Sequence, residues 1–407
     1  MHAALPSTLN ERLTQKANLR STRFGWLRLT PAYSVHLVSE LADAEFSQVL
    51  DPFCGTGTTA LVCAEKGISA VTTDINPFLV WLAQVKTRAY AEETLNEFLE
   101  LAKAALDRNH DDTFEPWYPP IHEITKWCDQ PILDSLGRLM AAIHDLGASS
   151  SEPAIDLLKV TFCRTMIDFA HVSFGHQSMS FKRRDDDHPL LLDVDDKFAA
   201  KWLAHAREIF VAAQSPILAE PRILQVDARN LSDYMSADSC DAVITSPPYP
   251  NRMSYIRELR PYMYWLGYLR DGKEAGALDW KAIGGTWGSA TSNVAKWVNP
   301  GTEVPFEGFV RVIDRIADKS GLLANYVHKY FVDIWAHLGS LRSVLKRGAS
   351  INYIVGNSKF YDVLLPVEQI FAAMFREVGF SSVTVRAIRK RTSKKELFEF
   401  VVAANSQ

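Results

Sequence analysis

The stretch of sequence that decides the fold is residues 48–74, QVLDPFCGTGTTALVCAEKGISAVTTD. A short apolar run ends at residue 50, residues 51–59 are small and turn-forming, and residues 58–66 fit a helix that Gly67 stops. A second apolar strand follows and ends at Asp74. This order of strand, loop, helix and strand predicts a βαβ unit, and hence an α/β fold whose mostly parallel sheet is covered by helices.

A large insertion is expected after this unit. The next similar strand, residues 222–229 (RILQVDAR), comes much later than a βαβ crossover needs. Apolar residues recur every three to four positions in several stretches before it, which predicts a helical insertion over residues 88–220. Those stretches are residues 91–108, 131–146, 153–169 and 198–213.

The last part of the chain is expected to complete the sheet. Strands are predicted at residues 241–249, at residues 349–358 and, as a pair joined by a basic turn, within residues 381–404. Helices are predicted at residues 328–348, with Gly348 as the cap, and at residues 365–380. Residues 271–305 form a polar, glycine-rich stretch.

The composition of the 407-residue chain is that of an ordinary globular protein. Hydrophobic residues make up 47% and charged residues 23%, which excludes a disordered chain, a collagen-like repeat and a coiled coil. No apolar run approaches the roughly 18 residues of a membrane span, and the N-terminus lacks the pattern of a secretory signal. The five cysteines form no CxxC pair, so we expect a reduced, cytoplasmic protein without a metal site.

The loop Asp51-Pro-Phe-Cys-Gly-Thr-Gly-Thr-Thr59 has the features of a ligand-binding turn. Small residues let a ligand approach the backbone, and the following helix N-terminus supplies free amide groups. Asp74, at the end of the second strand, lies where nucleotide folds bind ribose hydroxyls. The loop lacks the GK[ST] of a triphosphate-binding loop and is not GxGxxG. The alternative reading is a tight turn without a ligand.

The second motif, Thr245-Ser-Pro-Pro-Tyr249, follows a predicted strand. Its two prolines stop the strand and hold backbone carbonyls outward. Ser246 and the Pro247 carbonyl can accept hydrogen bonds from an amino group, while Tyr249 can stack on a flat ring. Taken alone, the motif also fits a proline turn that merely ends a strand.

Together the two motifs resemble those of amino-methyltransferases that use S-adenosylmethionine (SAM). Within that group, SPPY in place of DPPY or NPPY is more typical of DNA N4-cytosine methyltransferases. The resemblance implies a Rossmann-like class I methyltransferase fold with a seven-stranded sheet. It divides the chain into a basic segment and SAM-binding half (residues 1–87), the helical insertion as a candidate target-recognition region (residues 88–220), and a catalytic half (residues 221–407).

The resemblance also implies the roles of individual residues. Ser246, Pro247, Pro248 and Tyr249 would form the catalytic motif, which holds the amino group of a flipped base. Asp74 would bind the ribose hydroxyls, and Asp227 would face the adenine amino group. The full set expected at the cofactor is Thr30, Pro31, Asp51, Phe53, Cys54, Gly55, Thr56, Gly57, Thr58, Asp74, Ile75, Asp227 and Ala228. We expect Cys54 to be a small packed residue rather than a nucleophile.

Double-stranded DNA is the expected partner, although the formal net charge is −4. Local basic stretches can still form a phosphate-binding face. Residues 386–395 hold six basic residues and no acid, and residues 10–28 are also basic. The expected phosphate contacts are Arg252, Arg257, Arg389, Lys390, Arg391 and Lys394. The alternative is that a basic turn protects the edge of a hairpin.

Several functional alternatives stay open at the level of sequence. The same chemistry applies to adenine N6 of DNA, and base-amino methyltransferases acting on RNA share the fold. A SAM-binding but inactive DNA-binding subunit is a third alternative, against which the intact motif at residues 246–249 argues. A separate cognate restriction endonuclease is a further candidate partner, and the sequence does not indicate the oligomeric state.

Overall fold

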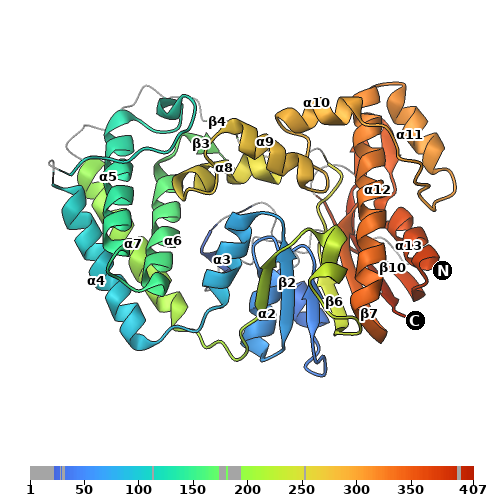
Figure 1. Cartoon of the computed structure of the whole chain (residues 1–407), viewed down its shortest axis with the longest axis horizontal. Coiled ribbons are helices and arrows are strands. Elements are labelled where there is room, and N and C mark those ends of the chain that lie inside the picture. Colours follow the sequence, from blue (N-terminus) through green and yellow to red (C-terminus); the bar gives the residue numbers. More distant parts are fainter. Residues whose placement is uncertain are drawn as a thin grey trace.

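The computed structural model describes residues 23–27, 29, 33–111, 114–173, 180–181, 194–251, 254–391 and 396–407. Its centre is a seven-stranded sheet in the order β10-β11-β7-β6-β1-β2-β5 (Figure 1). The strands are β1 (Val49–Asp51), β2 (Ala70–Asp74), β5 (Arg222–Gln225), β6 (Cys240–Thr245), β7 (Leu345–Gly356), β10 (Ser381–Lys390) and β11 (Phe398–Asn405). Neighbouring strands are parallel, except that β11 runs antiparallel to both β7 and β10. This sheet confirms the expected Rossmann-like α/β fold.

Helices cover both faces of the sheet. They are α1 (Val35–Leu41), α2 (Thr58–Lys66), α3 (Pro77–Thr87), α12 (Gly321–Val344) and α13 (Val367–Val378). A further helix, α8 (Tyr255–Trp265), packs with α3 and the helical insertion. Side chains alternate between the faces along a strand, so Val49 packs with α1 and α2 while Leu50 packs with α12. Both side chains are fully buried, as expected for a central parallel strand. The predicted helix at residues 58–66 is confirmed, with Gly67 as its left-handed cap.

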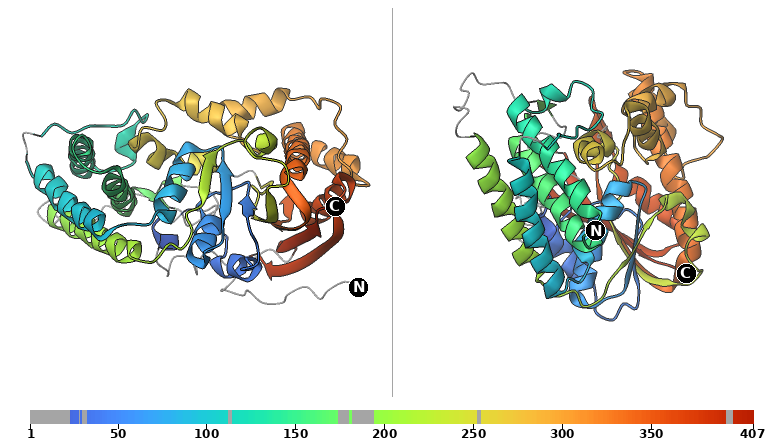
Figure 2. Two further views of the ribbon diagram at one scale, coloured as in Figure 1. Left: turned by 60° about the horizontal axis from the view of Figure 1, so that its bottom comes forward. Right: turned by 60° about the vertical axis from the view of Figure 1, so that its left-hand side comes forward.

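The described part of the insertion between α3 and β5 contains a bundle of four α-helices. They are α4 (Glu92–Asn109), α5 (Gln130–Gly147), α6 (Glu152–Phe169) and α7 (Val194–Ala213). Figures 1 and 2 show the bundle beside the sheet, on the side of edge strand β5. Its core continues into α3 and α8, where Trp265 packs against Phe162 and Trp117. The bundle therefore shares one hydrophobic core with the helix that follows the TSPPY motif.

The buried side chain of Arg23 connects the bundle to the sheet domain through hydrogen bonds. This side chain belongs to the N-terminal basic segment that we considered for DNA contact, yet it is fully buried. Its guanidinium donates to carbonyl groups at the ends of α3 and α7, which are Lys86 O, Arg88 O, Ala212 O, Ala213 O and Ser215 O. A cation is favourable at a helix C-terminus, and here one cation serves two of them. Arg23 is therefore a structural residue.

Replacing Arg23 by methionine is expected to lower the free energy of unfolding by about 2–3 kcal/mol. The change keeps the apolar stem but leaves several buried carbonyls without their charged donor. Urea denaturation measures the effect. The matched control is Arg222→Met, because Arg222 is exposed and donates to a single carbonyl, that of Tyr234. The control should change stability by less than about 0.5 kcal/mol, and an equal loss in both variants would contradict the structural role of Arg23.

Two features of the C-terminal half differ from the prediction. The helix α12 ends at Val344, so the expected cap at Gly348 is wrong. Gly348 lies inside β7 with φ of +80°, where the pairing with β6 shifts register between Cys240 and Ala242. Glycine serves both helix caps and strand bulges, so its presence did not distinguish them.

The polar stretch at residues 271–305 contains two helices that the sequence did not reveal, α9 (Gly272–Lys281) and α10 (Ser289–Lys296). Asp271 caps α9 by accepting from two amide groups in its first turn. Asp279, on α9, accepts from Ser254 Oγ at the start of α8 and from Trp287 N. In Figure 1 these two helices lie between the bundle and α12, whereas α11 (Phe309–Ala317) lies on the other side of α12.

The remaining elements are short. They are the strands β3 (Val172–Ser173), β4 (Ser180–Phe181), β8 (Ser358–Phe360) and β9 (Val363–Leu365), and the 3-10 helices η3 (Arg23–Gly25), η4 (Ile124–Lys126) and η6 (Ala228–Asp233). Across the described ranges, no helix is both long and apolar enough to span a membrane.

Candidate active site

A hydrogen bond joins the two sequence motifs directly. β1 and β6 are parallel neighbours, so the glycine loop (residues 52–57) and the TSPPY motif (residues 245–249) leave the sheet at the same edge. Thr245 Oγ1, at the end of β6, donates to Asp51 Oδ1, at the end of β1, over 2.6 Å. Two motifs that are far apart in the sequence are therefore held together by their last strand residues.

Asp51 is an internal brace for this edge. Its side chain is fully buried and also accepts from Tyr33 Oη and from the Phe53 amide, each over 3.1 Å. Burial raises the pKa of this carboxyl, and the hydrogen bonds from Thr245 and Phe53 oppose that rise. The carboxylate thus points into the protein, where it fixes the start of the glycine loop relative to β6.

The glycine loop is shaped by close approaches that only glycine allows. Gly55 and Gly57 have φ of +52° and +78°, and a Cβ on Gly57 would lie 3.0 Å from Ala83 Cβ. Thr56 and Thr58 are buried, with their hydroxyl oxygens 3.3 Å apart. Gly57 provides no side-chain cap for α2, so the first amides of that helix stay available to a ligand.

Two buried side chains support the loop from below. Cys54 is 1% exposed and accepts a hydrogen bond from Thr72 Oγ1, and burial raises the pKa of its thiol. It is therefore packed, as expected, and not poised as a nucleophile. Lys86, also 1% exposed, donates to Thr56 O over 3.0 Å, and burial lowers the pKa of its ammonium to about 8. Sequence reasoning missed Lys86, whose one signal was a lysine in an apolar helical run.

Asp74 presents a carboxylate at the end of β2. Its Oδ2 accepts from Gly55 N over 2.9 Å and its Oδ1 from Asn76 N over 2.8 Å. Each oxygen retains a further lone pair, so the group can also accept from two hydroxyls. Burial raises the pKa of Asp74 to about 6, although the backbone hydrogen bonds oppose the rise. Ile75, the next residue, is half-buried beside it.

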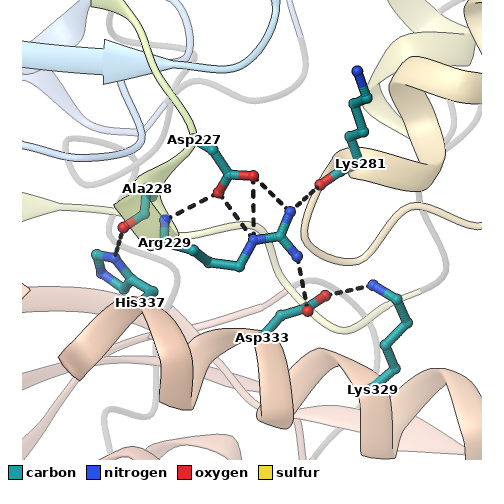
Figure 3. A network of polar contacts seen from close by, with 7 residues as sticks. All are labelled: Asp227, Ala228, Arg229, Lys281, Lys329, Asp333 and His337. Carbon is teal, nitrogen blue, oxygen red and sulfur yellow. Dashed lines mark hydrogen bonds and ion pairs between the residues drawn. The ribbon is translucent and has the colours of Figure 1, made fainter. Parts of the chain in front are cut away.

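Asp227 follows β5 and is engaged by Arg229 (Figure 3). Arg229 donates to both carboxylate oxygens of Asp227, with Nη2 to Oδ2 at 2.6 Å, and it also donates to Asp333 Oδ1 and Lys281 O. Lys329 completes the network through Asp333 Oδ2. Burial works to raise the pKa of Asp227, but the bonds and charge of Arg229 outweigh it and lower that pKa. The network ties the end of β5 to α9 and α12.

His337 on α12 supports the same region and was not found from the sequence. Its Nδ1 lies 2.8 Å from Ala228 O and its Nε2 lies 2.6 Å from Tyr353 Oη. Because a carbonyl only accepts, Nδ1 carries the proton and Nε2 accepts from the tyrosine. Burial lowers the pKa of His337 to about 4, so the ring is neutral. Phe53 packs edge-on against it, with ring centroids 4.8 Å apart.

The TSPPY motif is held by β7 and α12. Ser246 Oγ donates to Ile354 O over 3.1 Å, and Tyr330 Oη donates to Pro248 O over 2.7 Å. Pro247 is buried between them. The Tyr249 ring lies beneath the Arg391 guanidinium, and burial raises the pKa of its phenol, which therefore stays protonated.

Four of the expected site residues lie outside the described residues. They are Thr30 and Pro31 of the cofactor set and Arg252 and Lys394 of the DNA set. Of the other expected DNA contacts, Arg257 on α8 and Lys390 on β10 are half-buried.

The other basic side chains considered for DNA contact are engaged within the protein. Arg389 forms a two-bond ion pair with Glu399, at 2.5 and 2.6 Å, and Arg391 donates to Asn357 O. Arg260, a further basic side chain on α8, has its guanidinium over the rings of Trp127 and Trp287. Because these arginines already have partners within the protein, they are less available to phosphate groups than the basic sequence pattern alone indicates.

Comparisons with known proteins point to methyltransferases. No family model matches the chain. Type II methyltransferase M.AvaI of Nostoc sp. is 20% identical over 92% of this chain and 83% of its own length. Type II methyltransferase M.BsoBI of Geobacillus stearothermophilus is 20% identical over 94% and 84%. A SAM-dependent methyltransferase structure from Methanosarcina mazei is 11% identical over 93% of this chain and 99% of that one, with a TM-score of 0.30.

The strand order is that of a Rossmann-like fold, and the relatives' names support a methyltransferase. SAM is accordingly its cofactor. The chemistry of the site fits this cofactor, since it offers a glycine loop, an uncapped helix N-terminus and a carboxylate at the end of β2.

Proposed function

We propose that the chain is a DNA methyltransferase that methylates the exocyclic amino group of a flipped base, specifically cytosine N4. The observation that carries the proposal is the hydrogen bond between Thr245 and Asp51, which fixes Ser246 beside the glycine loop. The names of the relatives M.AvaI and M.BsoBI support a type II enzyme, and SPPY supports cytosine over adenine.

In the proposed complex, SAM supplies an electrophilic sulfonium methyl group. Gly55, Gly57 and the first turn of α2 would bind its polar end, and Asp74 would accept from the ribose hydroxyls. The carboxylate of Asp227 is already engaged by Arg229. We therefore propose that the neighbouring backbone of Ala228, fixed by His337, forms the adenine edge together with Asp227.

Ser246 and Pro247 would prepare the target nitrogen. The amino group of cytosine is a poor nucleophile because its lone pair is delocalised into the ring. Ser246 Oγ donates its proton to Ile354 O and lies 3.5 Å from Tyr249 Oη, so its oxygen lone pairs can accept hydrogen bonds. Hydrogen bonds donated by the two amino N–H groups, one to Ser246 Oγ and the other to the Pro247 carbonyl, would favour a pyramidal nitrogen with a directed lone pair. Positioning and local polarity then supply most of the rate enhancement.

A base inside a duplex cannot reach these groups, so the proposal includes base flipping. Tyr249 would stack on the extruded ring. Phosphate contacts are proposed for Arg257 and Lys390, and also for Arg252 and Lys394, which lie outside the described residues. A cognate restriction endonuclease, a recognition role for the helical bundle and a cytoplasmic location stay predictions.

Incubation with tritiated SAM tests the proposal. Unmethylated genomic DNA and total RNA are supplied in parallel, and the nucleosides are released by nuclease digestion and identified by mass spectrometry. We expect label in N4-methylcytosine of DNA. N6-methyladenine would leave the fold, cofactor and site unchanged and correct the base. Label confined to RNA would overturn the DNA assignment.

The affinity for SAM is expected to depend on the ionisation of Asp74. Its pKa of about 6 means that the carboxylate is ionised above that pH and loses acceptor capacity below it. SAM affinity should therefore be constant above about pH 7 and fall about tenfold per unit well below pH 6. The same raised pKa means that ionised Asp74 costs folding free energy above pH 6, a cost that disappears as the pH falls.

Calorimetric titration of SAM from about pH 5 to about pH 8 measures this dependence. The control is Asp74→Asn, which cannot ionise and should bind SAM weakly with little change across the range. If the affinity of the wild-type protein for SAM stayed constant down to about pH 5, the proposed contact between Asp74 and the ribose would be wrong.

A further inference from the structure

Arg391 covers one face of the Tyr249 ring. Its Cζ lies 5.3 Å from the ring centroid, and its Nη1 donates to Asn357 O over 3.0 Å. A guanidinium over an aromatic face is attracted by the ring quadrupole, most strongly where water is excluded. The Arg391 guanidinium, which the sequence analysis expected to contact DNA phosphates, is therefore engaged within the protein.

The position of Arg391 is fixed on both sides of the hairpin. Its amide donates to Leu397 O over 2.8 Å. Its acceptor residue, Asn357, donates from Nδ2 to Glu396 O and accepts at Oδ1 from Phe398 N. The guanidinium is therefore attached to backbone that is itself bonded across β7 and β11.

Gly356 closes the edge of the same ring. A Cβ at residue 356 would lie 2.8 Å from Tyr249 Cε2 and 3.0 Å from Arg391 Nη1. Contacts this short force the neighbouring atoms to move. The Tyr249 ring is thus covered by a guanidinium on one face and by main chain along one edge, so a stacked base would have to use the opposite face.

The neighbouring arginine shows that this arrangement is specific. Arg389 lies two residues earlier on the same strand and is neutralised by Glu399. Arg391 instead places its charge over the tyrosine ring of the catalytic motif. Of these two hairpin arginines, one stabilises the strand pair and the other contacts the reaction site.

We propose that Arg391 is a positioning residue that holds Tyr249 so that the target base stacks on the face opposite the guanidinium. The inference rests on the proposed function, because it assigns the stacking partner of a flipped base. It differs from a phosphate contact, in which the charge alone would matter and lysine would substitute well. A planar guanidinium that stacks and donates at once has no lysine equivalent.

Four variants test the role of Arg391, with kcat and KM for DNA measured by transfer from tritiated SAM. Arg391→Met should lower kcat about 10- to 100-fold, because a small displacement of a positioned base is that costly. Arg391→Lys should not restore kcat. Gly356→Ala, which changes no charge, should also lower kcat by pressing on Tyr249. Lys390→Met is the comparison for a basic residue that contacts phosphate.

The salt dependence of binding to a fluorescent duplex separates the two roles without an activity assay. Arg391→Met and Gly356→Ala should keep the wild-type slope of log Kd against log salt. Lys390→Met should lower it by about one. A wild-type kcat for Arg391→Met would overturn the inference. A slope reduced by about one in Arg391→Met, together with full recovery of kcat in Arg391→Lys, would also overturn it.

Failure of this inference is distinguishable from failure of the proposed function. If wild-type protein labels only RNA, the DNA assignment fails, and the same variants assayed on that RNA still decide whether Arg391 positions Tyr249. If Arg391→Met does not fold, as judged by its thermal transition, Arg391→Lys and Gly356→Ala carry the test. Wild-type kcat in both of those variants would then reject the positioning role.

Discussion

Ser246→Ala is expected to lower kcat about 100- to 1000-fold while leaving SAM affinity within about twofold of wild type. The variant removes one of two acceptors that would hold the amino group in its reactive geometry, and removal of one such group typically costs this much. Ser246 lies after β6 and donates to Ile354 O, so the substitution does not disturb the buried pair of Thr245 and Asp51. Single-turnover transfer to DNA, with calorimetry of SAM binding alongside, measures both quantities.

The matched control is Ser239→Ala at the other end of the same strand. Ser239 immediately precedes β6, and its hydroxyl also donates to a neighbouring carbonyl, that of Val344, over 3.4 Å. The control makes the same chemical change away from the carboxyl edge of the sheet, and its kcat should stay within about twofold of wild type. Equal activity of Ser246→Ala and wild type would reject the proposed mechanism, and equal losses in both variants would show a general effect on the strand.

The sequence predicts those elements of the fold whose boundaries are set by residues within or next to them. The helix at residues 58–66 is bounded by Gly57 and Gly67, and both glycines have the positive φ that such boundaries need. The strands around it are short and buried except for Asp74 at the end of β2, so their apolar runs were sufficient to identify them. By contrast, Gly348 gave the same signal for a different reason, because a bulge in β7 also requires a left-handed residue.

The residues that support the site could not be predicted from the sequence, because their roles depend on contacts between segments that are far apart in the chain. Lys86 and His337 each lie in helices that read only as apolar and amphipathic. Their functions follow from what the fold brings to them, which is the carbonyl of Thr56 for Lys86 and that of Ala228 for His337. Arg23 gave a misleading signal, since basic residues in a polar segment are usually solvated.

In the glycine loop, Gly57→Ala is expected to cause a large loss of SAM affinity. Residue 57 has φ of +78°, a conformation that costs an L-residue about 1–2 kcal/mol. The added Cβ would also lie 3.0 Å from Ala83 Cβ and 3.2 Å from Ala83 Cα. Backbone atoms of α3 cannot move aside cheaply, so the loop itself must change shape. We expect SAM affinity to fall about 30- to 100-fold, the equivalent of about 2–3 kcal/mol.

Gly67→Ala separates the strain of the residue from the shape of the loop. Gly67 has nearly the same φ, +72°, and ends the same helix, but its added Cβ would come no closer than 3.5 Å to Leu218. It should therefore cost about 1 kcal/mol of stability and leave SAM affinity within about twofold of wild type. Calorimetry and urea denaturation of both variants measure the two effects. If Gly57→Ala lost only stability and bound SAM normally, the glycine loop would not be the cofactor site, and binding would have to be sought elsewhere along the sheet edge.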